Sequence, residues 1–88
     1  MASDDAIKDQ AQQALANLPV RAGDWFVHYK GGKYEVAALA LKEDTLEPLV
    51  IYRSPQHGNT VWARSYSEWN SEVEWEGKTV QRFVKTTL

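Results

Sequence analysis

The 88-residue sequence contains no cysteine and only two histidines, His28 and His57. The missing cysteine excludes a disulfide framework, a thiolate nucleophile and a cysteine-based zinc site. The two histidines do not show the close spacing of zinc ligands. We therefore expect no metal and no cofactor. His57 is expected to be a solvated turn residue and His28 a half-exposed strand residue.

Long apolar runs are also missing. No run approaches the roughly 20 residues that a helix needs to cross a bilayer. The N-terminus shows no basic start followed by an apolar stretch, which a secretory signal would have. We therefore expect no membrane partner and a cytoplasmic location.

Neither sign of charge dominates the chain, whose formal net charge is −2. Residues 25–88 carry eight acidic and eight basic side chains. A neutral body argues against a general duplex-DNA binder, because the affinity of such a protein comes from a basic surface. The neutral net charge does not exclude a local basic patch on this part of the chain.

The motifs of common enzyme classes are missing too. No serine lies in a Gly-x-Ser-x-Gly elbow, and Gly31-Gly32 does not match a phosphate-binding loop. Glu72, Glu74 and Glu76 project to one side of one predicted strand rather than facing each other across a cleft. A domain of this size also has little volume for a walled active site. We therefore expect no enzyme and assign no catalytic residue.

Aromatic residues, by contrast, are abundant, with four Trp, four Tyr and two Phe. Each large ring buries roughly 150–250 Å², so a few of them can build the core of one small domain. The strongest local signal is Gly31-Gly32 between two runs rich in aromatic and β-branched residues, 25–29 and 34–41. This pattern predicts a β-hairpin.

The N-terminal segment predicts a helix over residues 3–18, which Pro19 ends. Its apolar residues recur at helical spacing: Ile7, Ala11, Ala14, Leu15 and Leu18. We divide the chain into residues 1–23, helix and connector, and residues 24–88, a β domain. A helix this short is marginal alone, so we expect it to cover an open end of the β core. The alternative is a contact with a second copy, giving a homodimer.

The remaining chain predicts short strands and one helical turn. The strands are residues 25–29, 33–42, 49–53, 60–64, 72–76 and 79–85, and the turn is residues 65–71, anchored by Trp69. In 33–42 we place Tyr34, Val36, Ala38 and Ala40 on one face, with a bend where the second half becomes apolar on both faces. Short strands at close spacing predict a mostly β fold, a small antiparallel barrel with an N-terminal helix.

Several short motifs occur in a characteristic order: His28-Tyr29-Lys30-Gly31, Tyr34-Glu35-Val36, Thr45-Leu46-Glu47, Val50-Ile51-Tyr52-Arg53, Trp62-Ala63-Arg64, Gly77 and Arg82-Phe83. With this order the chain resembles a small bacterial family, Domain of Unknown Function family 1653, over residues 24–85. The resemblance implies a compact SH3-like β-barrel without an established activity, and it transfers no catalytic residue. The matched positions are Tyr29, Lys30, Gly31, Tyr34, Glu47, Tyr52, Arg53, Trp62, Arg64 and Arg82.

Basic residues next to aromatic rings form the candidate binding surface: Tyr29, Lys30, Tyr52, Arg53, Trp62 and Arg64. If strands 49–53 and 60–64 pair as a hairpin, Trp62 and Arg64 share one face, and Arg53 lies on a face with Ile51. Guanidinium groups beside rings can bind carboxylate or phosphate and support base stacking. The alternative is structural, with the arginines bonded to Glu47 or loop carbonyls and Trp62 in the core.

This surface predicts a non-catalytic binding or interaction module. Its expected partner is an anionic peptide or protein segment, or a single-stranded nucleic acid. Two alternatives stay open. The protein could be a structural or oligomerisation protein that uses the N-terminal helix, or an accessory subunit of an enzyme.

Overall fold

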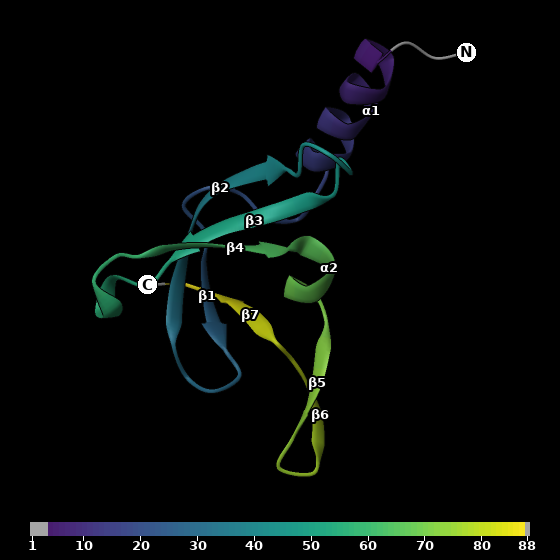
Figure 1. Cartoon of the computed structure of the whole chain (residues 1–88). Helices are drawn as coiled ribbons and strands as arrows, with labels where there is room; N and C mark the ends of the chain where they lie inside the picture. Colours follow the sequence, from purple (N-terminus) through teal and green to yellow (C-terminus); the bar gives the residue numbers. More distant parts are fainter. Residues whose placement is uncertain (1–3, 88) are drawn as a thin grey trace.

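The computed structural model describes residues 4–87 as a mostly β, antiparallel domain with an N-terminal helix (Figure 1). The elements follow in the order α1 (Asp4–Ala16), β1 (Trp25–His28), β2 (Lys33–Leu41), β3 (Pro48–Arg53), the 3₁₀ turn η1 (Pro55–His57), β4 (Val61–Ser65), α2 (Tyr66–Trp69), β5 (Glu72–Trp75), β6 (Lys78–Gln81) and β7 (Phe83–Thr86). The predicted fold class, mostly β with an N-terminal helix, is confirmed.

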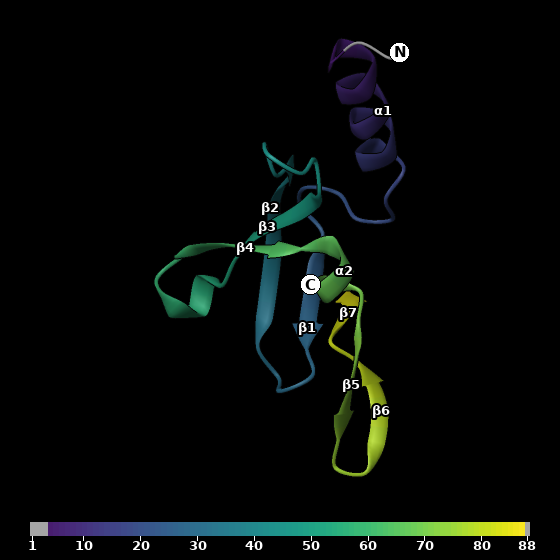
Figure 2. The ribbon, with the colours of Figure 1, turned by 45° about the vertical axis from the view of Figure 1, so that its right-hand side comes forward.

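Five strands form one curved sheet in the order β4-β3-β2-β1-β7, and β5 and β6 form a separate hairpin (Figures 1 and 2). The sheet does not close into a barrel, because β4 and β7 both remain edge strands. Closure would require these two strands to pair. The chain between them instead forms α2 and the β5–β6 hairpin, and β7 has only four residues. The expected closed barrel is therefore corrected to an open, curved sheet.

The predicted last strand, residues 79–85, is divided in two at Arg82. The first part, β6, pairs with β5, and the second part, β7, pairs with β1. The backbone N–H of Arg82 donates to the carbonyl of Ser71, and its carbonyl accepts from the N–H of Tyr29. Arg82 thus marks the point where the chain passes from the hairpin to the sheet.

The predicted first hairpin is confirmed as β1–β2, with Phe26 opposite Tyr34. The N–H of His28 donates to the Gly32 carbonyl at 2.8 Å, and the N–H of Gly31 donates to the His28 carbonyl at 2.7 Å. Gly31 has a φ of 104°, a conformation that glycine adopts without a Cβ clash.

A β-bulge bends β2 at Ala37. Val36 pairs with Tyr52, but Ala38 pairs with Ile51, so one extra residue stands on the β2 side. The predicted alternation is therefore wrong beyond Val36, since a bulge exchanges the two faces of a strand. Leu39, rather than Ala38 or Ala40, packs against the core.

The core is built largely from rings on the concave face of the sheet. Its buried residues are Val20, Phe26, Val36, Val50, Tyr52, Trp69 and Phe83. Trp69 of α2 stacks on Phe83 at a centroid distance of 3.7 Å and contacts Phe26 edge-on at 5.1 Å. The predicted anchoring role of Trp69 is confirmed, because its ring packs against the core rings of the sheet and holds α2 there.

Helix α1 does not cover the opening of the sheet. It contacts β2 and extends away from the β domain (Figures 1 and 2), and Ile7 stays 43% exposed. The buried core residue of the N-terminal segment is Val20, in the connector. The expectation that the helix caps the core is therefore corrected, and a contact with a second copy stays a prediction. Within residues 4–87, no helix is long and apolar enough to cross a membrane.

Candidate functional site

The concave face of the curved sheet holds a pocket of about 280 Å³, lined by His28, Tyr34, Tyr52, Trp62, Arg64 and Phe83. We call it the concave pocket. All five strands of the sheet contribute to it, because residues opposite each other in the register share a face. Tyr52 lies opposite Trp62, and His28 lies opposite Phe83. Because β4 and β7 do not pair, the concave face of the sheet stays open between these two edge strands, and the pocket lies on this face.

Tyr34 is the central ring of the pocket. Its centroid lies 5.5 Å from that of Tyr52, 5.9 Å from Phe83 and 6.3 Å from Trp62, each in an edge-to-face arrangement. Gly32 makes this position of the Tyr34 ring possible. A Cβ atom at Gly32 would lie only 3.0 Å from the ring carbon Cε2 of Tyr34. The position of the Tyr34 ring in the pocket wall thus depends on a residue without a Cβ atom at position 32.

Arg64 supplies a positive charge at the wall of the pocket. Its Nη1 donates to Oε2 of Glu68 at 3.2 Å, and its Cζ lies 5.9 Å from the centroid of the Phe83 ring. The Nε atom is buried and has no hydrogen-bond partner among the described residues. The Arg64 side chain as a whole is 29% exposed.

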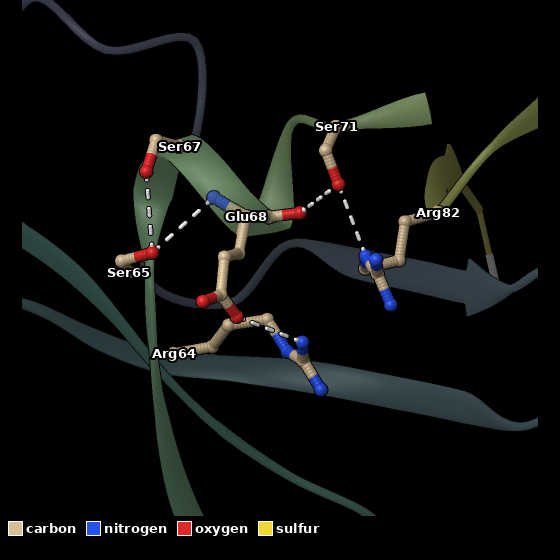
Figure 3. A network of polar contacts seen from close by, with 6 residues as sticks. All are labelled: Arg64, Ser65, Ser67, Glu68, Ser71 and Arg82. Atoms are coloured by element: carbon tan, nitrogen blue, oxygen red, sulfur yellow. Dashed lines mark hydrogen bonds and ion pairs between the residues drawn. The ribbon is translucent and has the colours of Figure 1, made fainter. Parts of the chain in front are cut away.

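A second arginine, Arg82, lies on the same side of α2 (Figure 3). Its Nε donates to the hydroxyl of Ser71 at 3.0 Å, and that hydroxyl donates to the carbonyl of Glu68 at 2.6 Å. Within the described part of the chain Arg82 forms no ion pair. In Figure 3 one terminal nitrogen of each arginine points away from α2. We call Arg64 and Arg82 the arginine pair; Glu68 is its one carboxylate partner among residues 4–87.

His28 lies among these cations. Burial lowers the pKa of His28 below the usual 6.5, and the charges of Arg64, Arg82 and Lys30 lower that pKa further. Its Nδ1 accepts the backbone N–H of Lys30 at 3.2 Å. At neutral pH the imidazole is therefore a neutral ring in a positively charged surrounding.

The structure brings three of the predicted site residues together, since Tyr52, Trp62 and Arg64 all line the concave pocket. Two more lie next to it. The ring of Tyr29 is 4.4 Å from that of His28, and Lys30 Nζ lies 5.7 Å from the Tyr29 ring.

Arg53 is the exception, because it lies on the opposite face of β3. It lies opposite Glu35 and Val61 in the register. Its Nη2 is 3.0 Å and its Nε 3.1 Å from Oε1 of Glu35. Arg53 thus forms an ion pair of the kind that the structural alternative describes, with Glu35 as its partner rather than Glu47.

Sequence reasoning did not include four residues of this region in the site: His28, Tyr34, Arg82 and Phe83. The family resemblance already contained Tyr34 and Arg82. Strand alternation could have identified Tyr34, because it shares a face with Val36, which is buried. Nothing in the local sequence of Arg82 and Phe83 shows that β7 returns to pair with β1.

His57, the second histidine, lies in η1 after β3 and does not line the concave pocket. His57 is exposed, as predicted, and its Nδ1 is 2.9 Å from the hydroxyl of Ser54. Ser54 is completely buried, and its carbonyl accepts the N–H groups of His57 and Asn59. These hydrogen bonds of Ser54 stabilise the loop between β3 and β4. Among residues 4–87, no group of three or more His, Asp or Glu side chains could hold a metal ion.

The fold and the concave pocket define a small antiparallel domain with arginines beside a cluster of rings. The chain belongs to the family described as protein of unknown function (DUF1653), whose family model matches residues 24–85. It is similar to the crystal structure of a DUF1653 protein from Bordetella bronchiseptica, with 30% sequence identity and a TM-score of 0.62. That match covers 74% of this chain and 85% of the other chain. No curated protein matches this chain.

Proposed function

We propose that this domain is a non-catalytic binding module whose concave pocket takes an anionic ligand with a flat ring or an apolar body. The observation that carries the proposal is the arginine pair. Arg64 lines the pocket and pairs with Glu68, whereas Arg82 acts by its charge on His28 in the pocket wall and forms no ion pair among the described residues. A phosphate or carboxylate would accept charge-assisted hydrogen bonds from both.

The size of the pocket supports a small ligand group. Its volume of about 280 Å³ is just below the range of roughly 300–1,000 Å³ that is typical of ligand pockets. One nucleotide or one side chain of a peptide suits such a volume, whereas a large cofactor does not. The rings of Tyr34 and Trp62 offer surfaces for the uncharged part of the ligand.

Binding rather than catalysis is proposed because of what lines the pocket. The lining consists of four aromatic side chains, Arg64 and His28, without a serine, lysine or carboxylate. His28, Tyr34 and Tyr52 belong to residue types that can act in general acid–base catalysis, but the lining holds no serine, lysine or carboxylate that could act as a nucleophile or orient the imidazole. Arginine and aromatic rings, by contrast, are the side chains that dominate binding surfaces.

The proposal is tested by ¹⁵N-HSQC titration with thymidine 5′-monophosphate and with a short glutamate-rich peptide. We expect shifts at His28, Tyr34 and Arg64 with at least one of these anions. The double variant Arg64→Gln/Arg82→Gln should lose them. Arg53→Gln is the matched control, because it removes an arginine from the opposite face, and it should keep them. If neither anion shifts the pocket signals at millimolar concentration, the proposal is wrong.

A second candidate is an oligomerisation protein that uses α1. The observation in its favour is the apolar stripe of α1, where Ile7 is 43% exposed and Leu15 is half-buried. Analytical ultracentrifugation of the full chain and of a chain without residues 1–16 tests this candidate. A dimer that becomes a monomer on truncation supports it, and a monomeric full chain contradicts it.

A further inference from the structure

A continuous row of rings crosses the concave pocket and continues onto the β5–β6 hairpin. The rings follow one another in the order Trp62, Tyr34, His28, Tyr29 and Trp75, with centroid distances of 6.3, 6.3, 4.4 and 5.2 Å. We call it the ring row. The hairpin extends beyond α2 alongside the β1–β2 hairpin (Figures 1 and 2). The two ends of the row, Trp62 and Trp75, are each 39% exposed.

Positive charges accompany this row along its length. The charges of the arginine pair act on His28 and lower its pKa, and Lys30 Nζ lies over the ring of Tyr29. At the far end, Lys78 lies directly opposite Trp75 in the β5–β6 register. Each segment of the ring row therefore has a cation beside it.

The two carboxylates of strand β5 lie on the other face of the hairpin. Trp75 and Val73 share the face of Lys78, while Glu72 and Glu74 alternate to the opposite side. The Oε1 atom of Glu74 accepts a hydrogen bond from the Thr79 hydroxyl, its cross-strand neighbour on that side. The ring row thus runs along a basic face although the domain as a whole is neutral.

We infer that the ring row is a binding track for single-stranded nucleic acid, with bases stacked on Trp62 and Trp75 and phosphates on the cations beside the row. The inference rests on the proposed function and names its ligand class. Rings and cations in alternation match a strand that alternates bases and phosphates. An acidic peptide would use the arginine pair but has no need of two separate exposed tryptophans. A stacked duplex would not offer its bases to these rings.

The test compares a mononucleotide with a longer strand by isothermal titration calorimetry. The probes are thymidine 5′-monophosphate, which fills only the concave pocket, and an oligothymidylate of about eight nucleotides. We expect the longer strand to bind more tightly. Trp75→Ala should weaken the longer strand about tenfold and leave the mononucleotide unchanged. Trp62→Ala should weaken both.

Two further variants separate the track from a loss of hairpin structure. Lys78→Glu keeps the ring of Trp75 and reverses one charge, so it should weaken the oligothymidylate alone. Val84→Ala, on an exposed residue of the outer face of the sheet, is the matched control and should change neither affinity. The affinity of the longer strand should fall with a log–log salt slope of about −2 to −3, as expected when a single strand contacts three or four cations.

The outcomes distinguish this inference from the proposed function. Equal affinities for the mononucleotide and the longer strand overturn the track and leave the pocket in place. The same holds if Trp75→Ala and Lys78→Glu both bind the longer strand normally, or if only the glutamate-rich peptide binds. If no anion binds at all, the track and the proposed function both fail.

Discussion

At the scale of single residues, His28 links the charge of the pocket to pH. Burial and the neighbouring cations Arg64, Arg82 and Lys30 lower its pKa in the folded protein. In the unfolded chain the ring returns to a pKa near 6.5. The native state therefore binds fewer protons than the unfolded state between the two pKa values.

This difference predicts the contribution of His28 to acid destabilisation. As the pH falls through 6.5 toward the lowered pKa, His28 becomes protonated in the unfolded chain while it stays neutral in the native state. The free energy of unfolding therefore decreases. Urea denaturation at about pH 8 and about pH 5 measures this decrease. His28→Gln should make it smaller. An equal decrease in both proteins would contradict the assignment, because the carboxylates titrate in both.

Gly32 is the second residue on which the pocket depends. Alanine at this position would place its Cβ 3.0 Å from Cε2 and 3.1 Å from the hydroxyl of Tyr34. We expect Gly32→Ala to move the Tyr34 ring and to cost about 1–3 kcal/mol, as overpacking does. Urea denaturation gives the cost, and ¹³C-edited NMR of the aromatic rings shows the displacement. Unchanged Tyr34 signals would contradict this role of the glycine.

Arg53 and Arg64 show how far residue-level reasoning reaches. Both follow an aromatic residue closely, so local sequence alone does not separate them. Strand alternation places Trp62 with Arg64 and Arg53 with Ile51, yet both arginines are predicted in one candidate surface. The β3–β4 register separates them, because Tyr52 lies opposite Trp62 and Arg53 lies opposite Val61. The identity of the partner, Glu35, depends on the pairing of β2 with β3, which a local pattern does not contain.

At the scale of elements, α2 is a short helix with two tasks. It presses Trp69 onto the core, and it orients the arginine pair through Glu68 and Ser71 (Figure 3). Such a short helix depends on its N-cap. The hydroxyl of Ser65 accepts the backbone N–H of Glu68 at 3.2 Å and supplies that cap.

The cap predicts a specific loss of stability. Ser65→Ala should lower the free energy of unfolding by about 1 kcal/mol, the usual cost of losing an N-cap, and should weaken anion binding because Glu68 positions Arg64. Ser67→Ala is the control, since Ser67 is exposed and caps no backbone group. Urea denaturation and calorimetry measure both effects. Equal losses in the two variants would contradict a capping role.

Two features at this scale could not be predicted from the sequence. A bend in residues 33–42 is predicted, but the position of the bulge at Ala37 is not, because it lies within a run of small apolar residues where one register fits about as well as its neighbour. The division of residues 79–85 at Arg82 depends on β7 returning to β1, a non-local pairing. The hairpin turn at Gly31 and the alternation in β5 have local causes, and both were predictable.

At the scale of the whole molecule, the helix and the β domain are largely separate. The longest extent of the molecule is 49 Å and the shortest 21 Å, and α1 extends from one end (Figure 2). The family match begins at Asp24. Val20, however, lies before this match and is only 3% exposed. The stable unit therefore begins in the connector.

This boundary predicts two different truncation results. Removing residues 1–16 should leave the free energy of unfolding of the β domain almost unchanged, because no described residue of α1 joins the buried core. Val20→Ala in the truncated chain should lower it by about 2 kcal/mol, as expected for two methyl groups deleted from a core. Thermal and urea denaturation measure both. A large loss on truncation alone would show that α1 belongs to the stable unit.

Three of the four tryptophans of the sequence fall into two groups of different exposure, and Trp25, in β1, is intermediate. Trp69 is buried against Phe83, whereas Trp62 and Trp75 lie exposed at the two ends of the ring row. Intrinsic fluorescence excited near the red edge of tryptophan absorption should report the exposed pair, and the blue-shifted emission should report Trp69. A stacked base should quench the first and leave the second, while unfolding should shift the second. The protein thus carries separate internal optical signals for ligand binding and for folding.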